Sequence, residues 1–391
     1  MTVAAAQPVP VWLVGTCACA SMASMRVCDA MLPAFAATFD ASAGQAARTI
    51  SAFAIAYGVL QLLFGPLGDR FGKLRVIGAA TLACTVGSAA AALSPNLDWL
   101  TASRVLSGAA AAGIIPLTMA WIGDTVAYEE RQAVLAQLLS ATVFGMIAGQ
   151  WLGGLLAETL GWRTAFAALA VVFATSGAML LWRTGGSPAS PRTAPQGLVR
   201  GFRAIVEIPW ARTVLVVVGI EGALAFSALA FIPSHLHLRF GLSMPQAGAV
   251  VALYGVGGLV YSRTARLLLR RIGETGLARV GGICMAFAFA TIGFAPSWHW
   301  TLPACLVAGF GFYALHNTLQ THATQMAPSA RGSAVALFAC CLFFGQSLGV
   351  SIAAGLVDRF STSVVFLISA CGLLLVGLLF ARRVRRRVVV G

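Results

Sequence analysis

The sequence predicts an all-α membrane protein whose twelve transmembrane helices form two pseudo-symmetric bundles of six. Three observations carry this prediction: a very apolar composition, long uninterrupted apolar runs, and an internal repeat. Of 391 residues, 59% are hydrophobic and 10% are charged, and the mean hydropathy is +0.86. Soluble domains carry about 25% charged residues, so a chain this apolar is expected to lie in a lipid bilayer.

The apolar runs are long enough to cross a bilayer, because a helix needs about 20 apolar residues to span the hydrocarbon core. Their continuity argues against a β-barrel, whose strands alternate over about 10 residues. The expected spans are 11–36, 46–67, 74–94, 98–122, 132–156, 163–183, 211–233, 246–268, 276–295, 299–323, 333–356 and 361–381. The polar connection at 184–210 is expected to be a cytoplasmic linker between an N-terminal bundle (1–183) and a C-terminal bundle with a basic tail (211–391).

The basic residues are distributed unevenly along this pattern. The formal net charge is +14, from 26 Lys and Arg against 12 Asp and Glu. Most of the basic residues fall in the tail and in alternate connections, whereas the remaining connections hold Arg48, Arg163, Arg239 and Arg359. The positive-inside rule then predicts cytoplasmic termini and a multi-pass protein of a bacterial inner membrane. Because topology accounts for the charge, no nucleic-acid partner is expected.

The two halves of the chain resemble each other. A shift of 200 residues pairs Arg131 with Arg331, Gly145 with Gly345, Gly149 with Gly349, Glu158 with Asp358 and Phe166 with Phe366. Each match alone is weak, and chance matches in an apolar chain are the alternative. The common offset nevertheless agrees with six spans per half. Repeated halves that hold a substrate between them near the midplane are typical of secondary transporters.

The connection between the second and third spans, GPLGDRFGKLRV at 65–76, is dense in charge and glycine. It resembles the signature loop of the major facilitator superfamily, G-x-L-a-D-R-x-G-R-r. The matching residues are Gly65, Leu67, Asp69, Arg70, Gly72, Lys73 and Arg75. The resemblance implies a cytoplasmic gate in which Asp69 accepts hydrogen bonds at the N-terminus of the eleventh span, with Asp124 and Arg131 nearby. A topology signal without a gate is the alternative.

Three further stretches resemble drug exporters of that superfamily. RVLSGAAAAG (104–113) resembles the pattern R-x-x-x-G-x-g-a-a around a buried arginine, Arg104, and CDAMLP (28–33) resembles the D-x-x-L-P stretch of twelve-span drug:proton antiporters. GMIAGQWLGG (145–154) resembles the antiporter signature g-x-x-x-G-P-x-x-G-G. Gly145, Gly149, Gly153 and Gly154 match this signature, and Gln150 replaces its proline. These resemblances imply a proton-coupled exporter of small organic or amphipathic compounds that works by alternating access and is not an enzyme.

Four charged residues stand out well inside the spans: Arg26, Asp29, Arg104 and Glu221. A charge near the bilayer centre costs about 2.5–3.5 kcal/mol on insertion scales, so such residues favour a functional role. Asp29 is the candidate proton carrier, because rocking of the halves would change its distance from Arg26 or Arg104 and hence its proton affinity. Glu221 is a candidate for a second proton or a cationic substrate. A static Arg26–Asp29 pair, and a neutral Glu221 held by hydroxyl groups, are the structural alternatives.

Polar and aromatic residues inside the spans are candidates for the lining of a substrate cavity. They are Tyr57, Gln61, Gln137, Phe226, Tyr254, Tyr313, His316, Asn317, Gln320 and Gln346. His316, Asn317 and Gln320 lie on one side of the tenth span, although a membrane histidine can also be a packing residue. The expected partners are therefore a small-molecule substrate, protons and the bilayer.

An alternative hypothesis is an importer of copper or another soft metal. Met22, Met25 and Cys28 form a stripe in the first span, and His322 and Met326 are spaced i, i+4 in the tenth. Thioether, thiolate and imidazole groups suit Cu(I), but Met and Cys also pack membrane helices. An uncoupled metabolite uniporter is a further alternative. No resident cofactor is expected, and a monomer is expected because one chain would contain a complete pathway.

Overall fold

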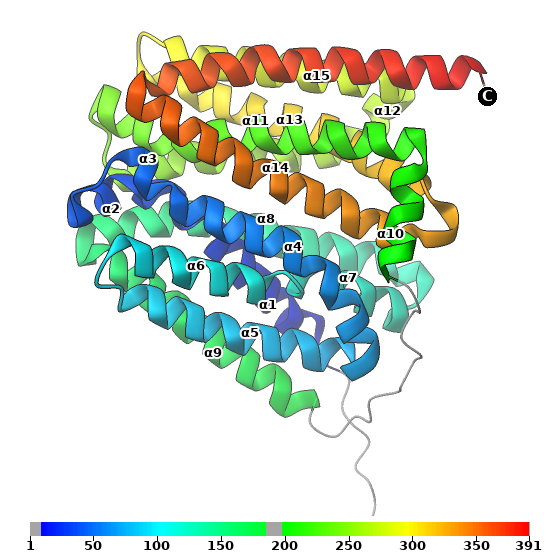
Figure 1. Cartoon of the computed structure of the whole chain (residues 1–391), viewed down its shortest axis with the longest axis horizontal. Helices are drawn as coiled ribbons and strands as arrows, with labels where there is room; N and C mark the ends of the chain where they lie inside the picture. The colour runs from blue at the N-terminus through cyan, green and yellow to red at the C-terminus, as the bar shows by residue number, and fades with distance from the viewer. Residues whose placement is uncertain (1–8, 185–197, 391) are drawn as a thin grey trace, which may run out of the picture.

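The computed structural model describes residues 9–184 and 198–390, and these residues are almost entirely helical. The N-terminal half contains α1 (Val11–Arg26), η1 (Asp29–Met31), α2 (Leu32–Phe39), α3 (Ala43–Ala46), α4 (Arg48–Phe71), α5 (Lys73–Ala92), α6 (Leu97–Ala111), α7 (Ile114–Thr125), α8 (Tyr128–Leu156), η2 (Ala157–Gly161) and α9 (Trp162–Thr184). The C-terminal half contains α10 (Leu198–Glu207), α11 (Pro209–Phe240), α12 (Met244–Phe294), η3 (Trp298–Trp300), α13 (Thr301–Gln325), η4 (Pro328–Ala330), α14 (Arg331–Arg359) and α15 (Thr362–Val390). The two halves lie against each other with their long helices running in the same general direction (Figure 1).

Ten segments of the described chain are long and apolar enough to cross a membrane. Two of them, residues 130–184 and 244–294, are 55 and 51 residues long. A straight helix of that length would measure about 75–80 Å, against a hydrocarbon core of about 30 Å. Each segment contains a glycine with positive φ, Gly161 at +87° and Gly273 at +64°. Such backbone geometry suits glycine and interrupts a helix.

The chain doubles back within α12. The Arg239 guanidinium donates to the Gly293 carbonyl at 2.6 Å, close to the end of α12. His237, one helical turn from Gly241, lies 2.7 Å from the Leu242 carbonyl, close to its start. Both ends of a 51-residue segment thus lie beside the same turn, so the chain reverses near Gly273. The expected spans 246–268 and 276–295 are the two arms of α12, and the total of twelve stays a prediction that this reversal supports.

Two of the expected spans are broken near their middles, where continuous helices were expected. The first span changes to 3₁₀ geometry at Asp29, and the fourth is interrupted between α6 and α7. A proline ring clashes with the carbonyl four residues before it and provides no N–H for the helix ladder. Pro33 lies four residues after Asp29, and Pro116 lies four residues after Ala112. The two prolines account for the positions of both breaks.

Small residues pack α8 on α1 and α14 on α11 at matching positions. A side chain added at Gly145, Gly149, Gly345 or Gly349 would collide with the backbone of Cys19, Ala23, Gly219 or Ala223, respectively. Each contact in the second half is a contact of the first half moved by 200 residues. The shift that aligns the two halves of the sequence therefore also aligns their helix packing.

The halves meet along two seams, α4 with α14 and α8 with α12. At the first seam the Ser347 hydroxyl donates to the Ser51 carbonyl at 3.0 Å. At the second, Gly248 packs against the backbone of Gln150. The helix α10 lies within the predicted linker 184–210, whose glycines and prolines at 185–195 fall outside the described residues.

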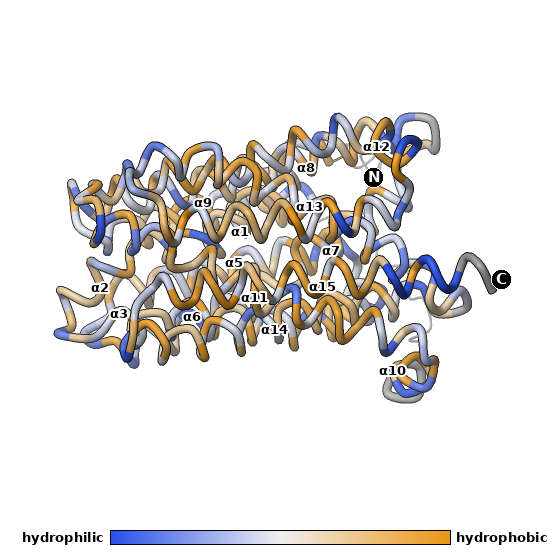
Figure 2. The backbone as a smooth tube through the Cα atoms, turned by 90° about the horizontal axis from the view of Figure 1, so that it is seen from above, coloured by the Kyte–Doolittle hydropathy of each residue, from blue (hydrophilic) through white to orange (hydrophobic). Residues whose placement is uncertain are grey.

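The two ends of the molecule differ in composition. One, here called the basic end, carries the α4–α5 connection, α10 and the arginine-rich end of α15 (Figure 1). The other, here called the opposite end, carries the connections near residues 40–42, 93–96, 241–243, 295–297 and 360–361. Hydrophilic residues gather toward these ends, and hydrophobic residues predominate along the helices between them (Figure 2).

Candidate functional site

Asp29 lies at the break in the first span and is completely buried. Arg26 is 3% exposed, and its Nη1 lies 3.5 Å from Asp29 Oδ2. That separation is longer than the usual 2.7–3.2 Å of a hydrogen bond. Within the described residues, neither carboxyl oxygen of Asp29 has a hydrogen-bond partner. Buried polar groups are normally hydrogen-bonded, so this under-satisfied pair is a candidate for a group that changes partners.

Arg26 reaches from the N-terminal half to the C-terminal half. Its guanidinium carbon lies 4.5 Å from the centroid of the Phe226 ring in α11, a cation–π geometry. Tyr254 and Tyr313, on α12 and α13, are close enough to Arg26 to interact with its charge. The Tyr254 hydroxyl is buried without a partner among the described residues. The Arg26–Asp29 pair therefore lies where the two halves meet.

Gln150 is the residue that stands in place of the proline of the antiporter signature. It is 1% exposed and lies beside the Asp29 carboxyl. Its Nε2 has no hydrogen-bond partner within the described part of the chain. The close packing of α8 on α1, through Gly149 against Ala23 and Gly153 against Val27, brings it there. The departure from the signature thus places an amide next to the buried acid, which sequence reasoning did not anticipate.

Arg104 is fully buried and fixes the first span in position. Its Nη2 donates to the Ser24 carbonyl at 2.6 Å, and its Nη1 donates to the Ser24 hydroxyl at 3.2 Å. Its guanidinium lies 4.3 Å from the Phe53 ring centroid and 5.8 Å from that of Phe166. Because Ser24 lies only five residues before Asp29, this anchor also places a positive charge near the acid.

Glu221 is fully buried on α11 and has a partner on α13. Nδ1 of His316 lies 3.0 Å from Glu221 Oε2, while Oε1 has no partner among the described residues. The His316 ring stacks on Phe312 with centroids 5.0 Å apart and lies 5.4 Å from Phe338. The partner of Glu221 is thus an imidazole and not the hydroxyl group that one sequence alternative named.

Four of the predicted cavity residues gather around one phenylalanine of α13. Phe312 lies 5.3 Å from Phe226, 5.8 Å from Tyr254 and 5.5 Å from Tyr313 between ring centroids, and it stacks on His316. Sequence reasoning missed Phe312, although its spacing of four from His316 placed both on one helix face. This aromatic cluster joins the Arg26–Asp29 pair to the Glu221–His316 pair.

The other predicted cavity residues lie apart from that cluster. Tyr57 packs on Phe343 across the α4–α14 seam at 4.6 Å between centroids. Gln61 and Gln346 are buried at 6% and 1% exposure, on α4 and α14 of the same seam. Asn317 lies beside Tyr261.

Gln320 and Gln137 lie farther toward the surface. Gln320 is half-buried on α13, whereas Gln137 is exposed. Gln137 lines a cavity of about 560 Å³ between α1, α7 and α8, together with Trp12, Trp121 and Phe144.

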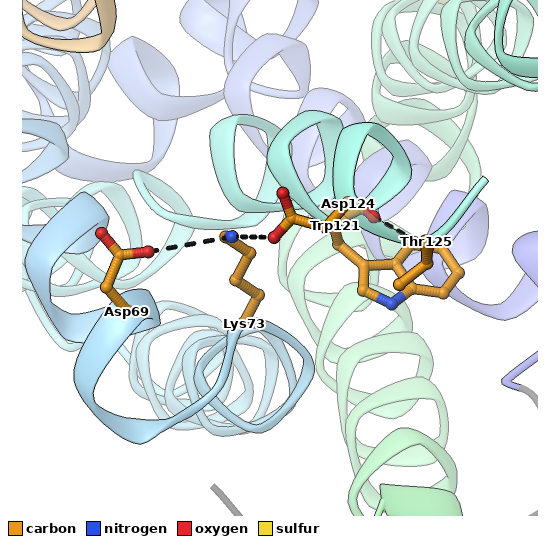
Figure 3. Close-up of polar contacts among 5 residues, drawn as sticks. All are labelled: Asp69, Lys73, Trp121, Asp124 and Thr125. Atoms are coloured by element: carbon orange, nitrogen blue, oxygen red, sulfur yellow. Dashed lines mark hydrogen bonds and ion pairs between the residues drawn. The ribbon is translucent and has the colours of Figure 1, made fainter. Parts of the chain in front are cut away.

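The signature loop forms an ion-pair network within the N-terminal half (Figure 3). Lys73 lies 3.8 Å from Asp69 and forms a hydrogen-bonded ion pair with Asp124 of α7. Within the described residues, Asp69 makes no hydrogen bond to the N-terminus of α14, the contact that the resemblance implied. Gly72 adopts φ +89°, which a side chain would strain.

Two of the remaining gate candidates, Arg70 and Arg131, contact neighbouring residues of their own half. The Arg70 guanidinium lies over the Phe71 ring, and Arg131 donates to the Val126 carbonyl at 3.3 Å. A side chain added at Gly65 would meet no atom within 4 Å. Arg75 lies in the first turn of α5. In this conformation the network joins α4, α5 and α7.

The predicted soft-metal ligands do not come together. Met22 and Met25 pack in the core of the N-terminal half, whereas Met326 packs in the core of the C-terminal half. His322 lies 3.2 Å from Glu274 and edge-on to Trp210. Within the described residues, no group of three or more His, Cys, Asp or Glu side chains is placed to hold a metal ion. This packing does not favour the soft-metal hypothesis.

Comparison with known proteins decides the family. A family model of the Major Facilitator Superfamily matches residues 14–341. The chain belongs to this superfamily. It is a multi-pass membrane transporter and not an enzyme, which agrees with the fold and the resemblance seen in the sequence.

One of the relatives and both solved structures named here match most of the chain, and a second relative matches about a third of it. A chloramphenicol resistance protein of Streptomyces lividans is 26% identical over 89% of this chain and 88% of its own. The multi-drug resistance efflux pump PmrA of Streptococcus pneumoniae is 31% identical over 37% of each chain. The crystal structure of nucleoside transporter NupG has a TM-score of 0.79 at 14% identity, covering 95% of this chain and 98% of that one. A D-xylose-proton symporter has a TM-score of 0.74 at 17% identity, over 95% and 96%.

Proposed function

We propose that this superfamily member is a proton-coupled secondary transporter that exports small organic or amphipathic compounds by alternating access. The observation that carries the proposal is the buried Arg26–Asp29 ion pair at the meeting of the halves, in which neither carboxyl oxygen accepts a hydrogen bond from the described residues. A buried acid without a fixed hydrogen-bond partner can lose and regain a proton when its surroundings change.

The contact of Arg26 with the C-terminal half supplies the coupling. When the halves rock, the Phe226 ring and the nearby Tyr254 and Tyr313 move relative to Arg26. The guanidinium then lies nearer to Asp29 or farther from it. A nearer positive charge favours the ionised carboxylate, and a more distant one favours the protonated acid. Proton release and uptake at Asp29 are thereby tied to the side on which the site is open.

The aromatic cluster supports the substrate class. Phe226, Phe312, Tyr254 and Tyr313 pack on one another next to the two buried pairs, and we propose that substrate binds where the rocking halves expose them. Ligand sites of this kind are mostly apolar with a few placed polar groups, which suits amphipathic compounds. The relatives named for multi-drug efflux and chloramphenicol resistance support the same class.

Orientation follows from charge. The basic end faces the cytoplasm by the positive-inside rule, the opposite end faces outward, and both termini lie inside. One chain contains both halves of the pathway, so the working unit is a monomer in the bacterial inner membrane.

The test is proton flux in liposomes that contain the purified protein and a trapped pH-sensitive dye. Chloramphenicol and a panel of amphipathic dyes are added outside, with and without an imposed pH difference. We expect at least one compound to release protons through the wild-type protein and through D98N, which neutralises an exposed acid at the opposite end, but not through D29N. Solute movement that does not change with the imposed pH difference would contradict proton coupling and favour a uniporter. Full proton flux through D29N would contradict the role of Asp29 as the proton carrier.

A further inference from the structure

The second and eighth spans begin with the same cap. Ser42 accepts a hydrogen bond from the Gln45 backbone, and the Gln45 side chain accepts one from the Ser42 backbone. Ser243 and Gln246 repeat this capping box at the start of α12. The two boxes lie 201 residues apart at the opposite end of the molecule. The first box leaves the N–H groups of Ala43 and Gly44 free to meet another acceptor, and the second leaves that of Met244, because Pro245 has no N–H.

A carboxylate from the other half occupies each of these helix starts. Asp358 of α14 accepts from the Gly44 backbone at 2.9 Å and from the Ser42 hydroxyl at 2.6 Å. Glu158 of η2 accepts from the Met244 backbone at 2.7 Å. In the first contact the carboxylate comes from the C-terminal half and the helix start from the N-terminal half. In the second contact the carboxylate comes from the N-terminal half and the helix start from the C-terminal half.

The two carboxylates are themselves repeat mates. Glu158 and Asp358 lie 200 residues apart, at the ends of the helices that pack on α1 and α11 through equivalent glycines. The close fit is built into the backbone, because a side chain added at Gly44 would lie 2.5 Å from the Ala354 carbonyl, and one at Gly154 would lie 2.5 Å from the Met244 carbonyl. The opposite end therefore carries one device twice, related by the pseudo-symmetry of the fold.

The geometry points to a paired latch: Asp358 on the α3 start and Glu158 on the α12 start hold the opposite end closed, and both release when that end opens. A helix N-terminus carries a partial positive charge and unpaired N–H groups, so it stabilises a carboxylate. Charge-assisted hydrogen bonds of this kind are stronger than neutral ones. Both carboxylates are solvent-exposed, so water replaces the helix start when the halves part.

The inference rests on alternating access, one part of the proposed function, and does not depend on proton coupling or on a particular substrate. It is therefore tested by measuring a distance between the two halves at the opposite end. Nitroxide labels are placed as noncanonical residues at Pro95 and Pro296, exposed positions in opposite-end connections of the two halves. This choice leaves the nine native cysteines in place. Pulsed electron spin resonance then measures the label separation in the full-length protein in lipid nanodiscs.

We expect the E158A/D358A variant to shift the ratio of open to closed populations by roughly 3- to 30-fold, since each helix-terminus contact contributes about 0.3–1 kcal/mol. Each single variant is expected to give a smaller shift. D98A is the matched control, because Asp98 is an exposed acid in the first turn of α6, a helix of its own half. A distance distribution of E158A/D358A that matches wild type, or an equal shift in D98A, would overturn the latch. The truncated acids are exposed, so their loss leaves the packed core intact.

Discussion

The two buried acids of this transporter are held in different ways. Asp29 lies at a break between helices, 3.5 Å from an arginine that contacts the other half. Glu221 lies inside the 32-residue helix α11, 3.0 Å from a histidine of its own half. The surroundings of the Arg26–Asp29 pair depend on the relative position of the two halves, whereas those of the Glu221–His316 pair depend on packing within one bundle. Burial of an acid therefore does not by itself indicate that the acid takes part in proton coupling.

The same contrast separates the two ends of the molecule. At the opposite end, carboxylates reach across to helix starts of the other half. At the basic end, the Lys73 network joins helices of a single half. In this structure the described hydrogen bonds between carboxylates and helix starts of the other half lie at the opposite end. The gate role of Asp69 at the basic end stays a prediction.

The largest expected effect sharpens the difference between the two acids. D29N is expected to lower gradient-driven transport by more than about tenfold, a change of 1.4 kcal/mol or more, because the amide cannot exchange a proton. E221Q is expected to keep most of that activity, because Glu221 stays within one bundle as the halves rock. Both are measured as substrate-induced proton flux in liposomes. Equal losses in the two variants would contradict the distinction.

Exchange provides the control for that experiment. D29N should still exchange labelled for unlabelled substrate when no pH difference is imposed, since that process needs no net proton movement. A variant that loses exchange as well has lost its substrate site or its fold, and Asp29 would then not be the coupling residue.

The second prediction concerns the stability of the protein and tests the Glu221–His316 pair of the C-terminal half. H316A leaves the Glu221 carboxyl buried with neither oxygen partnered, so we expect a loss of about 1–3 kcal/mol in the free energy of unfolding. The double variant E221Q/H316A should recover part of that loss, because it removes the unpaired carboxyl. Thermal unfolding in one detergent measures both. Additive losses in the double variant would show that the two residues do not interact.

Much of the fold was accessible from the sequence because it depends on local properties. Apolar runs gave the spans, and glycines spaced by four marked where helices touch. The 200-residue offset, found as weak matches, proved to relate actual contacts such as Gly145 with Cys19 and Gly345 with Gly219. The break at Asp29 was not predicted, although Pro33 explains it by removing the helix bond four residues earlier.

The candidate site was less accessible because its partners lie far apart in sequence. His316 and Glu221 were both candidates, but nothing in a 3.6-residue period says that residues 95 positions apart form a pair. Gln150 counted as a defect in a motif, and its position beside Asp29 emerges only from the packing of α8 on α1. Asp69 was expected at the N-terminus of the eleventh span, whereas in this structure it lies 3.8 Å from Lys73.

Gln150 offers the third prediction. Q150L removes the amide beside Asp29 while keeping a side chain of similar size, so we expect a severalfold loss of coupled transport, because the buried carboxyl then faces an apolar group that disfavours its ionised form. The loss should be accompanied by a shift of the pH at which transport is half-maximal, because the surroundings of the acid change. Q132L is the matched control, since Gln132 is exposed near the start of α8, 18 residues before Gln150. An unchanged pH profile for Q150L would limit Gln150 to packing.

The smallest effect should come from Phe226, whose ring lies under Arg26. F226L keeps an apolar side chain but removes the cation–π contact, which contributes about 0.5–2 kcal/mol depending on desolvation. Because leucine still packs beside the guanidinium, we expect the lower end of this range, about a twofold weakening of coupling, read as substrate moved per proton released, with less effect on binding of an apolar substrate. F173L removes an equally buried ring inside the N-terminal half and controls for the cavity that the substitution creates. If F226L and F173L lower coupling equally, the contact between Arg26 and the C-terminal half does not transmit the motion, and the Arg26–Asp29 pair would be static like the Glu221–His316 pair.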